Sequence, residues 1–407
     1  MPNPHSKPDS TESGSALEVL LAFLKLGLTS FGGPVAHIGY FRIEFVEKRR
    51  WLDESHFAQL LAICQFLPGP ASSQLGFAVG LLRAGWPGAI AAFVAFTLPS
   101  ALLLFGFAAL LPLLSGETGI AATHGLKLVA VAFVAHAVFA MSRQLCPDPR
   151  RQTLAVLAAA AVLIFGSAQF QFVVIALGAA AGWYLCTDVK AVAANTLKVR
   201  YGMTTGWVLL IVFAVLLAGL QLLPANSLSW PAVFGAFYHA GALVFGGGHV
   251  VLPMLEETVV SPGWVSPQAF LSGYGAAQAV PGPLFSVAAY LGAQLPGNSG
   301  GAFGAAVALL GIFLPGFLLV SAALPLWRTF SGHPAAARAI AGANAAVVGL
   351  LAAAFYDPVF TTAVKNPTDF AIGLVALLLL AGWRRSPLII VAWCVAASIA
   401  AMWAGLA

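Results

Sequence analysis

Two sets of glycine, proline and glutamine residues are the part of this chain that could form a binding site. The second set repeats the first at an offset of 213 to 214 residues, as from Gln65 to Gln278 and from Phe31 to Phe245. Glycine and proline interrupt helices, so their repetition inside apolar segments predicts two copies of one unit with broken helices. Such paired interruptions in a membrane protein point to a transport site. The repeated stretches are Phe31-Gly32-Gly33-Pro34 and Gln65-Phe66-Leu67-Pro68-Gly69-Pro70, matched by Phe245-Gly246-Gly247-Gly248 and Gln278-Ala279-Val280-Pro281-Gly282-Pro283.

Half-helices that start after these interruptions would favour an anion. Each helix start offers free backbone N–H groups and about half a positive charge. Ser72, Ser73 and Ser286 follow the Pro-Gly-Pro turns, and Gln65 and Gln278 precede them. These side chains can donate hydrogen bonds, so the predicted site is neutral to positive and suits an oxyanion. The alternative is that glycine and proline only permit close helix packing.

Few ionisable residues lie inside apolar segments. Lys127 is one, and a cation at that depth costs about 2.5 to 3.5 kcal/mol on insertion scales, so it is expected to have a role or a partner. Its counterpart in the second copy is Asn344, another hydrogen-bond donor. His37, His249 and Glu256 are candidates for proton coupling, although packing or helix capping accounts equally well for the two histidines.

The sequence lacks the motifs of several other classes. It contains no HExxH zinc motif, no Walker loop, no Gly-x-Ser-x-Gly elbow and no pair of intramembrane aspartates, so neither an enzyme nor an ATP-driven pump is indicated. The four cysteines are scattered without metal-ligand spacing, and we expect no metal and no cofactor. The net charge of +5 comes from short basic clusters between apolar runs, so no nucleic-acid partner is expected.

The composition is that of a membrane protein. Hydrophobic residues make up 60% of the chain and charged residues 8%. Apolar runs long enough to span a bilayer recur along its length. We distinguish thirteen apolar segments, 17–41, 56–82, 87–114, 123–141, 153–165, 170–187, 206–223, 231–255, 267–292, 300–326, 335–356, 367–382 and 387–406.

The distribution of basic residues decides between two topologies. If every segment crossed the membrane once, the loop from Arg42 to Arg50 would lie outside, against the positive-inside rule. Re-entrant hairpins at 17–41 and 56–82 return this loop to the cytoplasm, since each arm reaches only mid-membrane. Broken helices that still cross remain the alternative.

The predicted fold is an all-α polytopic membrane protein. It has two homologous six-segment halves in inverted topology, with broken or re-entrant helices, joined by a linking transmembrane helix at 206–223. We expect a disordered cytoplasmic tail at 1–15, an N-terminal repeat at 16–190, a linker at 191–230 and a C-terminal inverted repeat at 231–407.

The repeated motifs, including Phe31-Gly32-Gly33-Pro34-Val35-Ala36-His37 and Phe245-Gly246-Gly247-Gly248-His249, resemble those of the chromate ion transporter family in its long, two-domain form. The resemblance covers nearly the whole chain past the tail. It implies a multi-pass protein of the bacterial inner membrane that exports chromate, confers chromate resistance and is driven by the proton gradient or the membrane potential.

The sequence leaves several alternatives open. Sulfate has the same shape and charge as chromate, and a passive anion channel could use the same broken helices. A membrane sensor or scaffold is a weaker third reading. The partners expected are a chromate-like or sulfate-like oxyanion and the lipid bilayer, while a monomer and a homodimer both remain open.

Overall fold

The chain folds into helices around two sets of broken helices. The computed structural model describes residues 14–165, 168–189, 197, 199–223, 228–245, 250–330 and 334–406, and in these ranges every regular element is helical. Five helices are long and apolar enough to cross a membrane, and four shorter apolar helices accompany them. These observations confirm a multi-pass, all-helical membrane protein. The expected tail at 1–15 lies largely outside the described residues, as do Gly246, Gly247, Gly248 and His249.

The two halves have the same order of helices. The first half contains α1 (Ala16–Thr29), α2 (Gly33–Arg42), α3 (Glu54–Phe66), α4 (Ala71–Leu110), α5 (Glu117–Leu145), α6 (Pro149–Phe165) and α7 (Ala168–Leu185). The linking helix is α8 (Met203–Leu220). The second half contains α9 (Trp230–Ala242), α10 (Val251–Val259), α11 (Pro267–Ala277), α12 (Val287–Ala293), α13 (Gly301–Phe330), α14 (Pro334–Ala354), α15 (Thr361–Ala363), α16 (Pro367–Leu377) and α17 (Pro387–Trp403).

Local sequence explains where several helices begin. The side chains of Ser15, Asp53, Ser266 and Asn366 each accept a hydrogen bond from a backbone N–H in the first turn of the helix that follows. Such N-caps satisfy donors that a helix start otherwise leaves free. The helix starts within the two repeated motifs, at α2 and α4, are instead preceded by Gly32 and Pro70 without a side-chain cap.

A sharp turn within α4 divides it into two antiparallel helices. Ala84 and Gly85 have non-helical backbone angles, and Gly85 has a φ of 66°. The two arms touch at Gly80 and Gly88, where an added Cβ on Gly80 would lie 2.5 Å from the Gly88 carbonyl oxygen. The second half repeats this contact between α12 and α13.

The broken helices are re-entrant. The first hairpin consists of α1 and α2, and the second consists of α3 and the first arm of α4. Both hairpins end beside the start of α1, where Glu18 accepts hydrogen bonds from Trp51 Nε1 and Arg83 Nη2, both at 3.1 Å. In the second half, the Ser299 hydroxyl donates to the Leu228 carbonyl, so the second hairpin also returns to the level of the first. Both halves therefore contain two hairpins that enter and leave by the same face.

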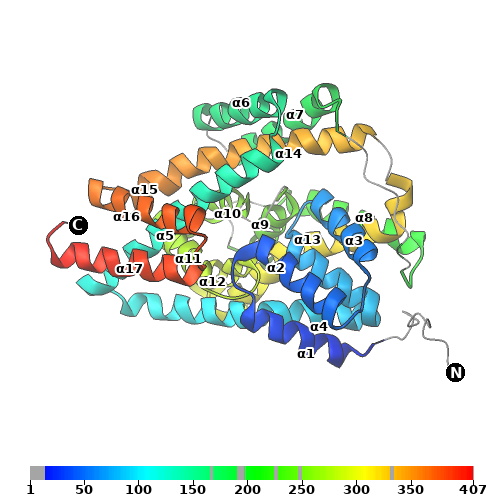
Figure 1. The fold of residues 1–407 in the computed structure, drawn as a ribbon, viewed down its shortest axis with the longest axis horizontal. Helices are drawn as coiled ribbons and strands as arrows, with labels where there is room; N and C mark the ends of the chain where they lie inside the picture. The colour runs from blue at the N-terminus through cyan, green and yellow to red at the C-terminus, as the bar shows by residue number, and fades with distance from the viewer. Residues whose placement is uncertain are drawn as a thin grey trace.

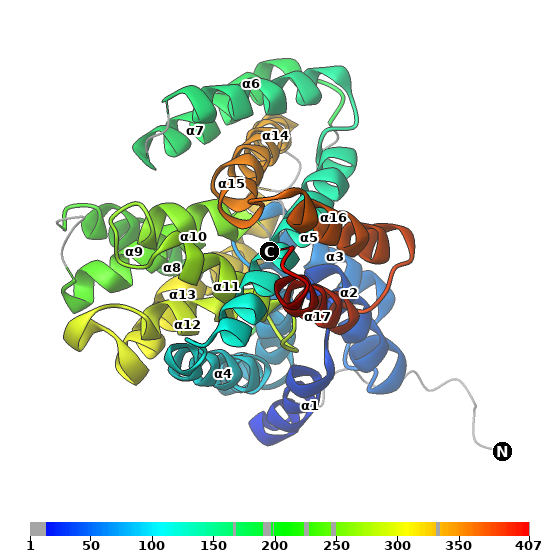
Figure 2. The same ribbon diagram turned by 90° about the vertical axis from the view of Figure 1, so that its left-hand side faces the viewer.

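The halves are inverted and exchange their last helices. Because α8 is long and apolar enough to cross the membrane once between them, the second half starts at the face opposite the first. Figure 1 shows α17 at one end of the molecule and α1 toward the other. Helix α14 of the second half packs on α6 and α7 of the first, while α5 packs on α16 and α17 (Figure 2). Glycines permit both contacts: a Cβ on Gly125 would lie 2.7 Å from the Cys394 carbonyl oxygen, and one on Gly342 would lie 2.1 Å from that of Gly178.

Single cysteines test this arrangement. We expect Lys48→Cys, after the first hairpin of the first half, and Asn298→Cys, after the second hairpin of the second half, to be labelled from opposite sides by a membrane-impermeant maleimide. Both positions are exposed, and the four native cysteines are buried, so background labelling will be low. Labelling of both positions from one side would contradict the inverted arrangement.

Candidate functional site

Each Pro-Gly-Pro turn is bound to a broken helix of the other half. The Gly69 N–H donates to the Val244 carbonyl at 2.6 Å, and the Gly282 N–H donates to the Ser30 carbonyl at 3.0 Å. Ser30 is the C-cap of α1, and Val244 follows the end of α9. Helix ends leave carbonyls without intrahelical partners, so each turn satisfies a helix end in the opposite repeat.

Both turns also lie against the helix that follows the second hairpin of the other half. An added Cβ on Gly69 would be 3.1 Å from the Gly316 Cα, and one on Gly282 would be 3.0 Å from the Ser100 hydroxyl. Gly69 and Gly282 have φ angles of 119° and 103°, which favour glycine. We call the two turns, with Ser30, Val244, Ser100 and Gly316, the junction. Ser100 and Gly316 were missed by sequence reasoning. Each directly follows a Leu-Pro pair, Leu98-Pro99 in the first half and Leu314-Pro315 in the second.

Several polar atoms of the junction and its neighbours are buried without partners. Among the described residues, no hydrogen bond is made by Ser30 Oγ, Ser73 Oγ, Gln74 Oε1, Thr97 Oγ1 or Gln278 Nε2. An unsatisfied buried polar group costs about 1–3 kcal/mol, so its occurrence requires an explanation. The two serine hydroxyls and the Gln278 amide are donors that a bound oxyanion would satisfy.

Other predicted residues are already engaged. The Ser286 hydroxyl is 2.7 Å from that of Ser100, and it also donates to the Pro283 carbonyl. His37 is fully buried in α2, with Nε2 3.2 Å from the Ser30 carbonyl oxygen and Nδ1 3.5 Å from Ser72 Oγ. His37 therefore connects the start of one half-helix to the end of another.

The described half-helix starts have the expected conformation. Gly32 and Gly33 have φ angles of 104° and 73°, and Pro34 occupies the first turn of α2. Pro70 is the N-cap residue of α4. In the second half, Pro281, Gly282 and Pro283 precede a short 3₁₀ turn, Leu284–Ser286, that leads into α12.

Lys127 lines a cavity of about 700 Å³ between α5, the start of α11 and the segment around Lys365 and Asp369. The ammonium group makes no hydrogen bond or ion pair within the described residues. Lys365 and Asp369 are its charged neighbours, and Asp369 is held by His124 at 2.7 Å. Ser272 and Ser398 also line the cavity, and the hydroxyl of Ser398 has no partner in the described parts of the chain.

Two further predicted residues, Asn344 and Glu256, do not line this cavity. Asn344, on α14, has a buried Oδ1 without a partner among the described residues. Glu256 is half-buried in α10, with Glu257 and Asp357 as its charged neighbours. Its predicted relation to His249 concerns a residue outside the described ranges.

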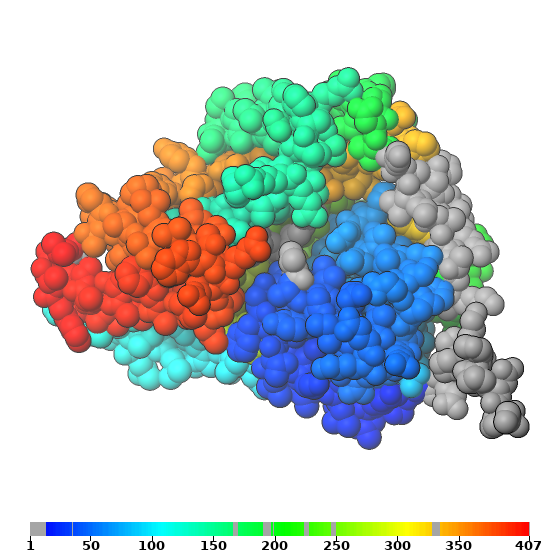
Figure 3. All heavy atoms as spheres, in the orientation of Figure 1, coloured from blue at the N-terminus to red at the C-terminus, as the bar shows by residue number. Residues whose placement is uncertain are grey.

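The two halves differ in how closely the helix before the Pro-Gly-Pro turn packs against a long helix of the other half. Helix α11 packs along α5 and is buried at every position from Phe270 to Ala277, and Gln278 is 8% exposed. The equivalent helix α3 does not pack along α14, although both are described throughout, and Gln65 is exposed. The surface recedes beside α3 in the space-filling view (Figure 3). The junction is thus covered on the α11 side and less covered on the α3 side.

Inverted repeats of re-entrant hairpins define the chain as a multi-pass membrane protein of the transporter class. Comparison with known families gives the particular one. The chromate transporter model matches residues 17–183 and again residues 231–401. The chain belongs to the chromate transporter family.

Curated relatives match almost the whole chain. A probable chromate transport protein of Synechococcus elongatus is 29% identical over 378 residues, which is 91% of each chain. A chromate transport protein of Cupriavidus metallidurans is 26% identical over 399 residues, covering 93% of this chain and 92% of the relative. One of Pseudomonas aeruginosa is 27% identical over 375 residues, covering 90% and 88%. No solved structure gives a significant match.

Proposed function

We propose that this protein is a secondary transporter that exports chromate across the bacterial inner membrane, driven by the proton gradient or the membrane potential. Such export would confer chromate resistance. The proposal is supported by membership of the chromate transporter family and by one structural observation, the set of buried, unpartnered donors at the junction.

The chemistry of the junction suits a tetrahedral dianion. Fixed full charges would hold such an ion too tightly, whereas hydroxyls, amides and helix starts offer partial charges that let it leave again. Ser30, Ser73 and Gln278 would donate to the oxyanion. Gln74 would not donate to the oxyanion, because its amide nitrogen already donates to the Pro68 and Gly316 carbonyls at 2.9 and 3.0 Å.

Lys127 would act at the side covered by α11. Its ammonium group has no hydrogen bond or ion pair within the described ranges, and it lies on α5 where α5 and α11 run parallel, with the Ser272 hydroxyl 3.4 Å from the Thr123 carbonyl. We infer that Lys127 receives the anion when the α5–α11 contact opens. Asn344 would take the equivalent place on α14, where a neutral donor lets the anion enter from the cytoplasmic side without being held.

The difference between the two sides fits alternating access. Separation of α5 from α11, together with closure of α14 on α3, would expose the junction to the opposite side. The hydrogen bonds between the turns and the opposite repeat would keep the centre intact while the outer helices rock.

Flux into sealed vesicles tests the proposal. Pure protein in liposomes should take up chromate at a saturable rate, and an imposed pH gradient or membrane potential should change that rate. Sulfate flux that exceeds chromate flux would assign sulfate as the substrate. Single-channel conductance in planar bilayers would indicate a channel instead of a carrier. The absence of any oxyanion flux would refute transport.

A further inference from the structure

Both ring nitrogens of His239 lie within hydrogen-bond distance of a backbone carbonyl oxygen. It lies on α9, with Nδ1 2.6 Å from the Gly235 carbonyl oxygen and Nε2 2.9 Å from the Leu217 carbonyl oxygen. Carbonyl oxygens only accept hydrogen bonds, so both contacts form together only when both ring nitrogens carry protons. The contact between Nε2 and the Leu217 carbonyl joins α9 of the second repeat to the linking helix α8.

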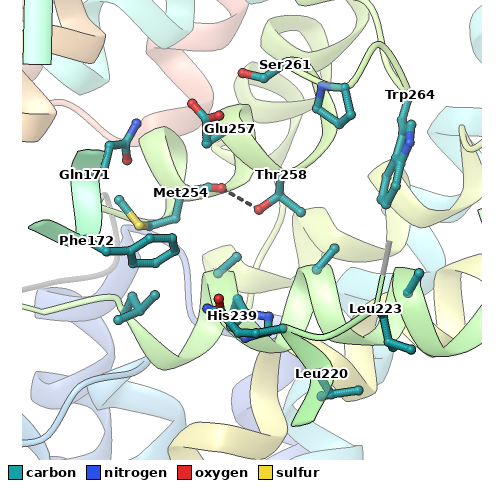
Figure 4. A pocket seen from close by; sticks show the side chains of 16 residues that line it. Gln171, Phe172, Leu220, Leu223, His239, Met254, Glu257, Thr258, Ser261 and Trp264 are labelled. Carbon is teal, nitrogen blue, oxygen red and sulfur yellow. Dashed lines mark hydrogen bonds between the residues drawn. The ribbon is translucent and has the colours of Figure 1, made fainter. Parts of the chain in front are cut away.

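The ring faces a pocket that also contains a carboxylate. The pocket has a volume of about 420 Å³ and is bounded by α7, α8, α9 and α10. Figure 4 shows Glu257 on the wall opposite His239, with the Thr258 hydroxyl donating to the Met254 carbonyl beside it. The pocket lies at the face where α8 ends and α10 returns, and Ser261 at its rim is exposed.

Few other charged groups face His239. Helix α8 contains no acidic or basic residue, and α13 contains none before Arg328. Helix α10 supplies Glu256 and Glu257, and only Glu257 lines the pocket. Within the described residues, His239 and Glu257 are therefore the titratable pair of this pocket. The carboxylate would repel an oxyanion, so the occupant indicated by this chemistry is a proton.

We propose that His239 is a proton-binding site and that Glu257 passes its proton to the outer surface. In the step, the Nε2–H bond of the imidazolium breaks, an O–H bond forms on the Glu257 carboxylate through pocket water, and Glu257 then releases the proton to bulk water. The neutral ring can no longer donate to both carbonyls, so the bond from His239 to Leu217 of α8 is lost, while the Tyr238 hydroxyl of α9 still donates to the Phe213 carbonyl of α8. That this step is coupled to oxyanion movement rests on the proposed transport function.

Nitrogen NMR of the full chain in lipid nanodiscs tests the site directly. With ¹⁵N-labelled histidine, the difference between wild type and His239→Gln identifies the ring. We expect two protonated ring nitrogens at pH 6, because both carbonyl contacts are then hydrogen bonds, and one after the proton has been removed by raising the pH. A ring with only one proton at pH 6 would overturn the proposal.

Flux measurements test the coupling. In His239→Gln, the ratio of chromate flux at pH 6 to that at pH 8 should fall to about one, because the titrating group is gone. His56→Gln is the matched control, since His56 is an exposed histidine beside Asp53 at the opposite face and should leave the wild-type ratio unchanged. An unchanged ratio in His239→Gln would refute the coupling. If the wild type moves no oxyanion, transport itself fails, and the NMR result still decides whether His239 binds the proton.

Discussion

Replacement of Lys127 by alanine is expected to lower chromate flux at least about tenfold, because the charge it removes interacts with an anion in a partly desolvated cavity. No hydrogen bond or ion pair holds the ammonium group among the described residues, so its loss should not unfold the protein. Lys127→Arg keeps the charge and should retain part of the flux. The measurement is chromate uptake by vesicles that contain equal amounts of each variant.

Lys365 provides a control for charge alone. It lines the mouth of the same cavity, but it is exposed, and its ammonium group donates to the Thr361 carbonyl at 2.6 Å. Lys365→Ala removes the same charge from a solvated position, where interactions are weak. We expect a change of about twofold or less. Normal flux in Lys127→Ala would show that Lys127 has no role in moving the anion.

Replacement of Gly275 by valine is expected to abolish transport by holding the α5–α11 contact open. An added Cβ would lie 1.9 Å from the Leu126 carbonyl oxygen, which is backbone and cannot turn aside. The two helices must separate to accommodate the side chain. The reporter is a cysteine at Ser272, which is 4% exposed and should become reactive to a maleimide added from the α11 side.

Ala62 is the matched position in the first repeat, on the less covered side. Helices α3 and α14 do not pack along each other there, so Ala62→Val should leave the Ser272 reporter protected. It should still slow transport, because closure of α14 on α3 would bring this side chain against α14. A protected reporter in Gly275→Val would refute the assignment of α5 and α11 as the closed side.

The arrangement of the fold follows from the sequence to an unusual extent. The repeat is visible because glycine and proline have few substitutes where a helix must break, as at Gly69 and Gly282. Inversion follows from an odd number of crossings between the copies, and the re-entrant hairpins follow from the basic loop between Arg42 and Arg50. These inferences rest on the backbone preferences of glycine and proline and on the cost of placing charge in a membrane. Both are properties of short segments.

The tertiary structure decided which residues meet. Sequence offsets pair Gly69 with Gly282, but the structure binds each turn to the other repeat, at Val244 and Ser30. The packing of α6 and α7 on α14, and of α16 and α17 on α5, likewise depends on contacts between segments far apart in the chain. His239 carried no signal in the sequence, because its two acceptors are backbone carbonyls and one belongs to another helix. Periodicity and charge fix the elements and their direction across the membrane, whereas packing alone determines which donors remain buried without partners.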